Sequence, residues 1–231
     1  MMTLKRSTDR KVANSLTANG NARIANSFGL PAGKAYSCPS ATSVCEKICY
    51  AGKLEKIYKG TRENLLHNFN ALSNATFDEM VKMLDAMISE FENECDKWGA
   101  PKLFRIHWDG DFFNQTYTLA WYDVILTHSE TRFWVYTRVE SAAKTLVNAS
   151  NLSLYFSTDS ENIATAKRLN EEFGIKLALL GQTFTEAKLL ANIRSAVCPE
   201  QRKQVALNGA CVSCGICPKG NANIAFSISK K

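Results

Sequence analysis

The chain has 231 residues, of which 45% are hydrophobic, and its 28 basic and 22 acidic side chains give a formal net charge of +6. This length buries one sizeable core, so we expect a single domain. No apolar run is long enough to span a membrane, and the charged start "MMTLKRSTDRK" lacks the apolar stretch of a signal peptide. The composition excludes an integral membrane protein and predicts a location in the cytoplasm.

The eight cysteines indicate metal binding. Because the cytosol keeps thiols reduced, disulfides are a poor explanation for so many cysteines in a chain without an export signal. Two 4Fe-4S clusters, held by three and four thiolates, would lower the net charge to about +3. The basic balance is then a weak argument for binding nucleic acid.

The first part of the chain is predicted to contain an arm, a strand and two helices. Residues 1–22 are polar, basic and rich in asparagine, which is typical of a flexible arm. A short strand before a turn is predicted within 22–33, and helices are predicted over 53–74 and 77–98. The second helix rests on apolar residues spaced three and four apart: Met80, Met83, Leu84, Met87, Ile88 and Phe91.

Beyond Pro101, strands alternate with helices. Strands are predicted over 102–110, 132–139, 152–160 and 175–183, and helices over 115–129, 140–150, 161–174 and 184–193. Right-handed crossovers return each strand beside its predecessor, so four successive βα units predict an α/β fold with parallel strands, either as a sheet or as a partial βα barrel. Residues 23–197 are assigned to this core and residues 198–231 to a cysteine-rich segment packed on the same domain.

Polar side chains stand at the carboxyl end of each of these strands. They are Asp109, Asp111, Thr137, Arg138, Ser157, Asp159, Gln182 and Thr183. In parallel α/β folds, ligands bind at that edge of the sheet. The sequence therefore predicts a polar pocket there.

The first cysteine group lies in the loop 37–53 and has the spacing Cys-x6-Cys-x3-Cys. It consists of Cys38, Cys45 and Cys49, with no fourth cysteine nearby in the sequence. A structural zinc site normally closes with four ligands. Three thiolates suit a 4Fe-4S cluster that keeps one iron free for an outside ligand.

The second group contains four cysteines, Cys198, Cys211, Cys214 and Cys217. A Cys-x2-Cys-x2-Cys run with one remote Cys-Pro is typical of ferredoxin-type clusters, and zinc on four thiolates is the alternative. Cys95 stands apart and is expected to be a packed or free thiol. His107 is the one histidine near a strand end, where a packed core role is favoured over a pocket role.

The segments "SCPSATSVCEKICYAG", "RIHWDGDFF", "WVYTR" and "CP…CVSCGICP" resemble the phage-encoded gene-product-88 family, over residues 30–218. The chain is more distantly similar to the radical SAM superfamily, whose usual spacing is Cys-x3-Cys-x2-Cys. That resemblance implies that the open iron of the first cluster takes S-adenosylmethionine. It also implies that the second cluster resembles the auxiliary clusters of that superfamily.

The resemblance to radical SAM enzymes also implies cofactor contacts. Tyr50 would lie near the adenine, and the stretch from Asp109 through Gly110 to Asp111 occupies the place of a Gly-Gly-Glu motif that binds the methionine amino group. Carboxylate and ribose contacts would come from Tyr136, Arg138, Ser157 and Asp159. The fork of an arginine suits a carboxylate, whereas the last of these residues also stands where a helix cap is expected.

Two functions are consistent with these patterns. The first is an enzyme that cleaves S-adenosylmethionine in a radical reaction on an unidentified substrate. The alternative is a non-enzymatic iron-sulfur or zinc protein that docks on nucleic acid or the transcription machinery of a phage host, in the host cytoplasm. Its basic elements would be the arm, the run 53–62 and the terminal Lys230 and Lys231.

The run 53–62 also has a simpler interpretation. Its bases step by three, so in one continuous helix they would spread around about half of its circumference and form a solvated face. They are Lys53, Lys56, Lys59 and Arg62.

Overall fold

The computed structural model describes residues 2–7, 11, 24–207 and 209–229. Most of the predicted arm, and the terminal Lys230 and Lys231, lie outside the described residues. Within residues 2–7, Leu4 is buried, and Arg6 forms an ion pair with Glu94 at 2.9 Å. These first residues therefore pack against the body of the protein.

Four helices precede the first strand. They are α1 (Ser43–Ile48), α2 (Tyr50–Ile57), α3 (Lys59–Ser73) and α4 (Phe77–Trp98). The single helix predicted over 53–74 is wrong, because the chain turns at Tyr58, whose φ of −113° and ψ of 98° are extended. The helix predicted over 77–98 is confirmed, with a capping box between Thr76 and Glu79 at its start.

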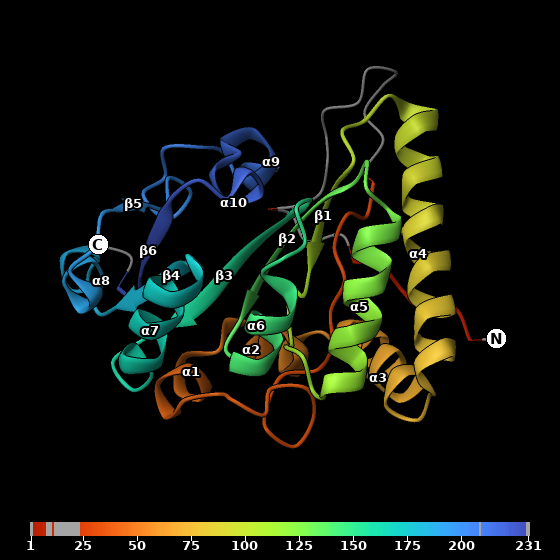
Figure 1. Cartoon of the computed structure of the whole chain (residues 1–231), viewed down its shortest axis with the longest axis horizontal. Coiled ribbons are helices and arrows are strands. Elements are labelled where there is room, and N and C mark those ends of the chain that lie inside the picture. Colours follow the sequence, from red (N-terminus) through yellow and green to blue (C-terminus); the bar gives the residue numbers. More distant parts are fainter. Residues whose placement is uncertain (1, 8–10, 12–23, 208, 230–231) are drawn as a thin grey trace.

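A parallel sheet of six strands forms the centre of the molecule (Figure 1). Its strands are β1 (Leu103–Ile106), β2 (Arg132–Thr137), β3 (Leu152–Thr158), β4 (Lys176–Gly181), β5 (Ser195–Val197) and β6 (Asn223–Ser227). The connecting helices are α5 (Gln115–Thr127), α6 (Glu140–Leu146), α7 (Ile163–Phe173) and α8 (Phe184–Ala191). The four predicted βα units are thereby confirmed.

The strand order is β1-β2-β3-β4-β6-β5, and all described neighbours are parallel. No pairing joins β1 to β5 among the described residues, so the sheet is not closed. The α/β class with parallel strands is confirmed in this open form. The two strands absent from the prediction, β5 and β6, extend the sheet beyond β4.

The predicted strand within 22–33 is an extended segment along the edge of β1. Its backbone alternates hydrogen bonds with that strand: Arg105 donates to Asn26 at 2.9 Å, and Phe28 donates to Arg105 at 3.1 Å. Farther along, the Leu30 amide donates to the Asp109 carbonyl at 3.0 Å. This pairing delivers the chain to the carboxyl edge of the sheet, where the first cysteine loop begins.

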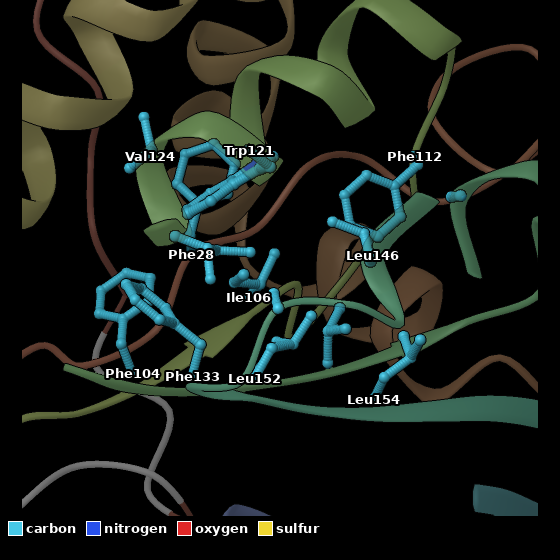
Figure 2. Close-up of a cluster of buried hydrophobic side chains, with 14 of the residues drawn as sticks. Phe28, Phe104, Ile106, Phe112, Trp121, Val124, Phe133, Leu146, Leu152 and Leu154 are labelled. Atoms are coloured by element: carbon cyan, nitrogen blue, oxygen red, sulfur yellow. The ribbon is translucent and has the colours of Figure 1, made fainter. Parts of the chain in front are cut away.

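The two faces of the sheet carry different layers. On one face, aromatic and aliphatic side chains pack beneath the helices, as Figure 2 shows for Phe104, Phe133 and Leu152 together with Trp121. Because side chains alternate along a strand, the intervening residues point to the opposite face. Burying this helix-covered core supplies the main stabilisation of the fold.

The opposite face carries the C-terminal cysteine segment, with short helices α9 (Ala210–Cys214) and α10 (Ile216–Lys219). The Pro218 carbonyl accepts hydrogen bonds from Arg132 at 2.9 Å and from Ser153 at 2.7 Å. Both donors lie at the amino ends of their strands. No helix within the described part of the chain is both long and apolar enough to cross a membrane.

Candidate functional site

The three cysteines of the first loop line one cavity of about 410 Å³. Cys45 lies in α1, and Cys49 is the joint between α1 and α2, where its Sγ accepts a hydrogen bond from the Gly52 amide at 3.3 Å. Thr42 begins α1 by accepting from the Cys45 amide at 3.0 Å. Two short capped helices therefore orient the thiols of one loop toward a common space.

Burial affects the ionisation of these thiols. It raises the pKa of Cys38 to about 12, with a smaller contribution from the nearby Asp111 carboxylate. Thiolates are the form that binds metal, so a cation or cluster would have to compensate for this burial. In the described part of the chain, no three His, Cys, Asp or Glu side chains surround one point as the ligands of a single metal ion do.

A pair of carboxyl groups lies beside the cavity. Glu55, in α2, lines the cavity and accepts a hydrogen bond from the Ala32 amide at 2.8 Å. Asp109 is buried, and its Oδ2 receives no hydrogen bond from the described residues. Burial, followed by the neighbouring Glu55 carboxyl, raises the pKa of Asp109 well above its ordinary value. A cation placed between these groups would be stabilised, because it would replace the missing partner.

Asp111 connects the ends of two strands. One of its oxygens accepts from the Thr137 hydroxyl at 2.6 Å and from the Phe112 amide at 2.8 Å, and the other accepts from the Arg138 amide at 2.8 Å. Burial nevertheless raises its pKa to about 6. Both oxygens are occupied within the chain, so this residue braces the sheet edge.

Arg138 and Asp159 hold the cysteine loop against the sheet. The Arg138 guanidinium lies 2.8 Å from Asp159 Oδ2, which also accepts from the Thr42 hydroxyl at 2.6 Å. Arg138 reaches Cys45 as well, where it opposes the effect of burial, which raises the pKa of that thiol. The helix cap expected at Asp159 is wrong: α7 is preceded by Asn162, and Asp159 instead accepts from the Glu161 amide within a turn.

Three other predicted residues lie around the sheet edge. The Tyr50 hydroxyl donates to the Trp108 carbonyl at 3.1 Å, and 51% of this tyrosine is exposed. Ser157 is half-buried at the end of β3. Tyr136 instead faces the second cysteine group, where its hydroxyl reaches Cys217.

Three further predictions concern residues away from the cavity. Thr183 caps α8 by accepting from the Glu186 amide at 3.2 Å, and Gln182 beside it is exposed, so neither of these strand-end residues lines the cavity. His107 is buried in the core, where it bonds the Tyr117 hydroxyl at 2.8 Å, and burial lowers its pKa to about 3. The packed role expected for this histidine fits that position.

Cys95 is fully buried, and its Sγ lies 3.7 Å from the Pro101 carbonyl. Burial raises the pKa of this thiol to about 12. It is a packed thiol, as expected.

The four cysteines of the second group are among the residues that line a separate pocket of about 20 Å³. They are Cys198, Cys211, Cys214 and Cys217. Left-handed glycines stand at the starts of α9 and α10, with φ of 68° at Gly209 and 67° at Gly215, and they allow the tight turns between the cysteines. Burial raises the pKa of Cys217 to about 12, and the other three thiols add to this effect. The fold thus brings all four together from distant segments.

Lys11 lies beside the second cysteine group. Its ammonium group pairs with Glu200 at 2.8 Å, and its carbonyl accepts from the Cys211 amide at 2.9 Å. Burial opposes the charge of Lys11, but Glu200 and, more weakly, Tyr50 and Cys211 raise its pKa. One described residue of the N-terminal segment is therefore held against the C-terminal cysteine segment and lies within electrostatic range of Tyr50.

Comparison with known proteins identifies the family. A family model described as Gene product 88 matches residues 2–220. The chain belongs to the gene product 88 family. Two relatives in this family, both called Gene 88 protein, come from Mycobacterium phages L5 and D29. They are 48% identical over 242 residues and 49% identical over 243 residues, and each comparison covers the whole of both chains. No solved structure matches.

The phage family predicted from the cysteine and strand motifs is therefore confirmed.

Sequence reasoning missed Glu55 and Lys47 as cavity residues. Lys47 stands between Cys45 and Cys49, so its place in the sequence was a signal that could have identified it. Glu55 stands within a run of bases, and no pattern in the sequence placed it near the cysteines.

Proposed function

We propose that this member of the gene product 88 family holds a 4Fe-4S cluster on Cys38, Cys45 and Cys49 and cleaves S-adenosylmethionine reductively. The observation that carries the proposal is the convergence of these three cysteines on one cavity of about 410 Å³, in a loop that Asp159 and Arg138 hold against the carboxyl edge of a parallel sheet. Cavities of this size hold small ligands and cofactors. The resulting radical would act on a bound substrate.

The donor set fits such a cluster. Three thiols line the cavity, and the described residues bring no fourth cysteine to its wall. A 4Fe-4S cluster bound there would supply an open iron site and an electron. The open parallel sheet, with its ligand edge facing the cysteine loop, is also consistent with a partial barrel of the radical SAM type.

Cofactor contacts are assigned to residues near the cavity. The carboxyl pair of Asp109 and Glu55 would bind the ammonium group of S-adenosylmethionine, because a cation offsets the repulsion between the buried Asp109 and the half-buried Glu55. The ring of Tyr50, next to Cys49, would lie near the adenine, and Ser157 would face the ribose. Arg138 and Asp159 are paired with each other, so their contribution is to position Cys45.

The second cysteine group would hold a fully ligated 4Fe-4S cluster. The four thiols share one pocket, and Tyr136 contacts one of them, Cys217. Such a cluster transfers electrons or stiffens the C-terminal segment. Zinc is the alternative at this site, because four thiolates satisfy its tetrahedral coordination.

Two measurements test the proposal. Iron, sulfide and zinc analysis of protein isolated without oxygen should find iron and sulfide, together with visible iron-sulfur absorbance. Chemical reduction in the presence of S-adenosylmethionine should then release 5′-deoxyadenosine. Cys49→Ala should abolish the release, whereas Cys95→Ala, the matched removal of a packed thiol, should retain it. No release above the Cys49→Ala background would refute the enzymatic function.

A second candidate function is a non-enzymatic iron-sulfur or zinc protein that docks on nucleic acid or the transcription machinery in the host cytoplasm. The exposed bases Lys53, Lys56 and Arg62 beside the cavity favour it. Metal-loaded protein that releases no 5′-deoxyadenosine but binds nucleic acid in a salt-dependent manner would support this alternative.

A further inference from the structure

Four basic side chains line the cavity of the three cysteines. Lys47 comes from α1, Lys53 and Lys56 from α2, and Arg62 from α3. Their convergence depends on the chain turns at Cys49 and Tyr58, which separate these helices. Sequence reasoning predicted that the bases of the run 53–62 would spread around one helix, and the turn at Tyr58 makes that prediction wrong. We call these four residues the cationic rim.

The charge of the cationic rim is only partly balanced by acids. Within the described part of the chain, none of its four members lies within ion-pair distance of a carboxylate. Two acids also line the cavity: Glu46 pairs with Lys34 at 3.4 Å, outside the rim, whereas Glu55 and its neighbour Asp109 add negative charge beside it. With about one negative charge from these two acids and about one from a cluster on three thiolates, about half of the rim charge is unmatched.

Lys59 provides an internal comparison. It belongs to the same basic run, but it does not line the cavity, and its side chain is 90% exposed. It pairs with Glu63 at 3.7 Å, one turn along α3. The unmatched bases of this run are therefore those that line the cavity.

The chemistry of the cationic rim selects a ligand with several negative charges. Four like charges around one concave surface repel each other and attract a polyanion. Arginine and lysine together are suited to phosphate oxygens. Aromatic rings lie close by: Tyr36 lines the cavity, and Tyr50 and Tyr58 stand at its helix joints, 51% and 58% exposed. Basic grooves with exposed aromatic rings bind the phosphates and bases of single-stranded nucleic acids.

We infer that the cationic rim binds the phosphate groups of the substrate, and that this substrate is a nucleotide or a single nucleic-acid strand. The inference rests on the proposed function for the reaction that follows binding. The binding itself depends on Lys47, Lys53, Lys56 and Arg62, which do not bind the cluster.

The test uses the full chain, isolated without oxygen, and a fluorescent single-stranded DNA of about 12 nucleotides. Fluorescence anisotropy measures its affinity between about 50 and 200 mM salt. The triple variant Lys53→Ala, Lys56→Ala and Arg62→Ala loses three phosphate contacts. The plot of log affinity against log salt concentration has a negative slope, and this slope should become shallower by about 2. The affinity at about 0.1 M salt should fall about a hundredfold.

Controls separate phosphate binding from general effects. Lys59→Ala removes a base of the same run outside the cavity, so it should bind DNA as the natural chain does. The charge-conserving variant Lys53→Arg, Lys56→Arg and Arg62→Lys should restore most of the affinity. Competition with ATP indicates whether a free nucleotide suffices or a strand is required, and either result is consistent with phosphate recognition.

Three results would overturn the inference: equal binding by the triple variant and the natural chain, an equal loss in Lys59→Ala, or equally strong competition by polyglutamate. Release of 5′-deoxyadenosine without DNA is measured on the same proteins. If the natural chain binds DNA through the rim but releases none, the proposed function fails while the phosphate assignment stands. If the natural chain releases 5′-deoxyadenosine but the rim variants bind DNA normally, the phosphate assignment fails while the proposed function stands.

Discussion

Gly110 controls how the first cysteine loop joins the sheet, and its replacement by alanine is the most direct test of the site geometry. Its φ of +83° lies in the left-handed region that favours glycine. An added Cβ would lie 2.5 Å from Ser37 Oγ, 2.7 Å from Leu30 Cβ and 2.8 Å from the Leu30 carbonyl oxygen. Ser37 directly precedes Cys38, so the added methyl group would displace the start of the loop.

The expected loss of stability follows from three costs. A left-handed alanine costs about 1–2 kcal/mol, and overpacking against atoms closer than 3 Å costs about 1–3 kcal/mol. The Ser37 hydroxyl donates to the Pro31 carbonyl at 2.7 Å and accepts from the Asp111 amide at 3.3 Å, and losing one such bond costs about 1 kcal/mol. Gly110→Ala should therefore lower the free energy of unfolding by about 3–6 kcal/mol.

Urea unfolding followed by circular dichroism measures this loss, and Gly60→Ala is the matched control. At Gly60, in α3, an added Cβ would meet nothing within 4 Å, so alanine should raise stability by about 0.5–1 kcal/mol. Iron analysis should show that Gly110→Ala loses the cluster of the first loop but retains that of the second. A loss below about 1 kcal/mol with full iron content would refute this account of the loop.

Three further predictions concern the charges around the sheet edge. Arg138→Leu leaves Asp159 buried without its cation and should lower the free energy of unfolding by about 3–5 kcal/mol. Adding Asp159→Asn should restore part of this loss. If the two single-variant losses, measured by urea unfolding, simply add in the double variant, the two residues are not a coupled pair. Burial lowers the pKa of His107 to about 3, so between about pH 6.5 and pH 3 only the unfolded chain protonates this histidine. The free energy of unfolding therefore falls as the pH falls, by up to about 1.4 kcal/mol per pH unit. His107→Asn, which tolerates the φ of 58°, should reduce the difference between urea unfolding at pH 7 and pH 5, and an unchanged difference would count against a neutral histidine. Glu55→Gln removes the charge beside Asp109, so Asp109 should ionise at a lower pH than in the natural chain, as measured by carboxyl ¹³C NMR. An unchanged titration of Asp109 would mean that burial alone raises its pKa.

The alternation of strands and helices was predictable because its causes are local. Each helix from α4 to α8 presents apolar residues at helical spacing, and four of the strands are apolar runs bounded by polar turns. The position of the ligand edge followed, since parallel strands connected by helices all end on the same side. Strand β5 was missed because it has only three residues, just before the cysteine-rich segment, and β6 was missed because it lies within that segment.

The break at Tyr58 was also invisible in the sequence. No proline stands near the break and the neighbouring glycine, Gly60, lies inside α3, so it is the extended backbone of Tyr58 that separates α2 from α3. The consequence is large, because it directs Lys53, Lys56 and Arg62 to one cavity. Local propensity is a weak predictor of such a joint, which depends on tertiary contacts.

The sequence by itself determined the chemistry available to this protein: two sets of cysteines, a parallel sheet and polar strand ends. These are properties of residue type and short-range spacing, which a single chain displays directly. Only the tertiary structure decided which groups meet. It placed Glu55 beside Asp109, turned Tyr136 toward Cys217 and occupied Asp111 with bonds inside the chain. Such pairings depend on how distant segments pack, and packing is a property of the whole fold rather than of any motif.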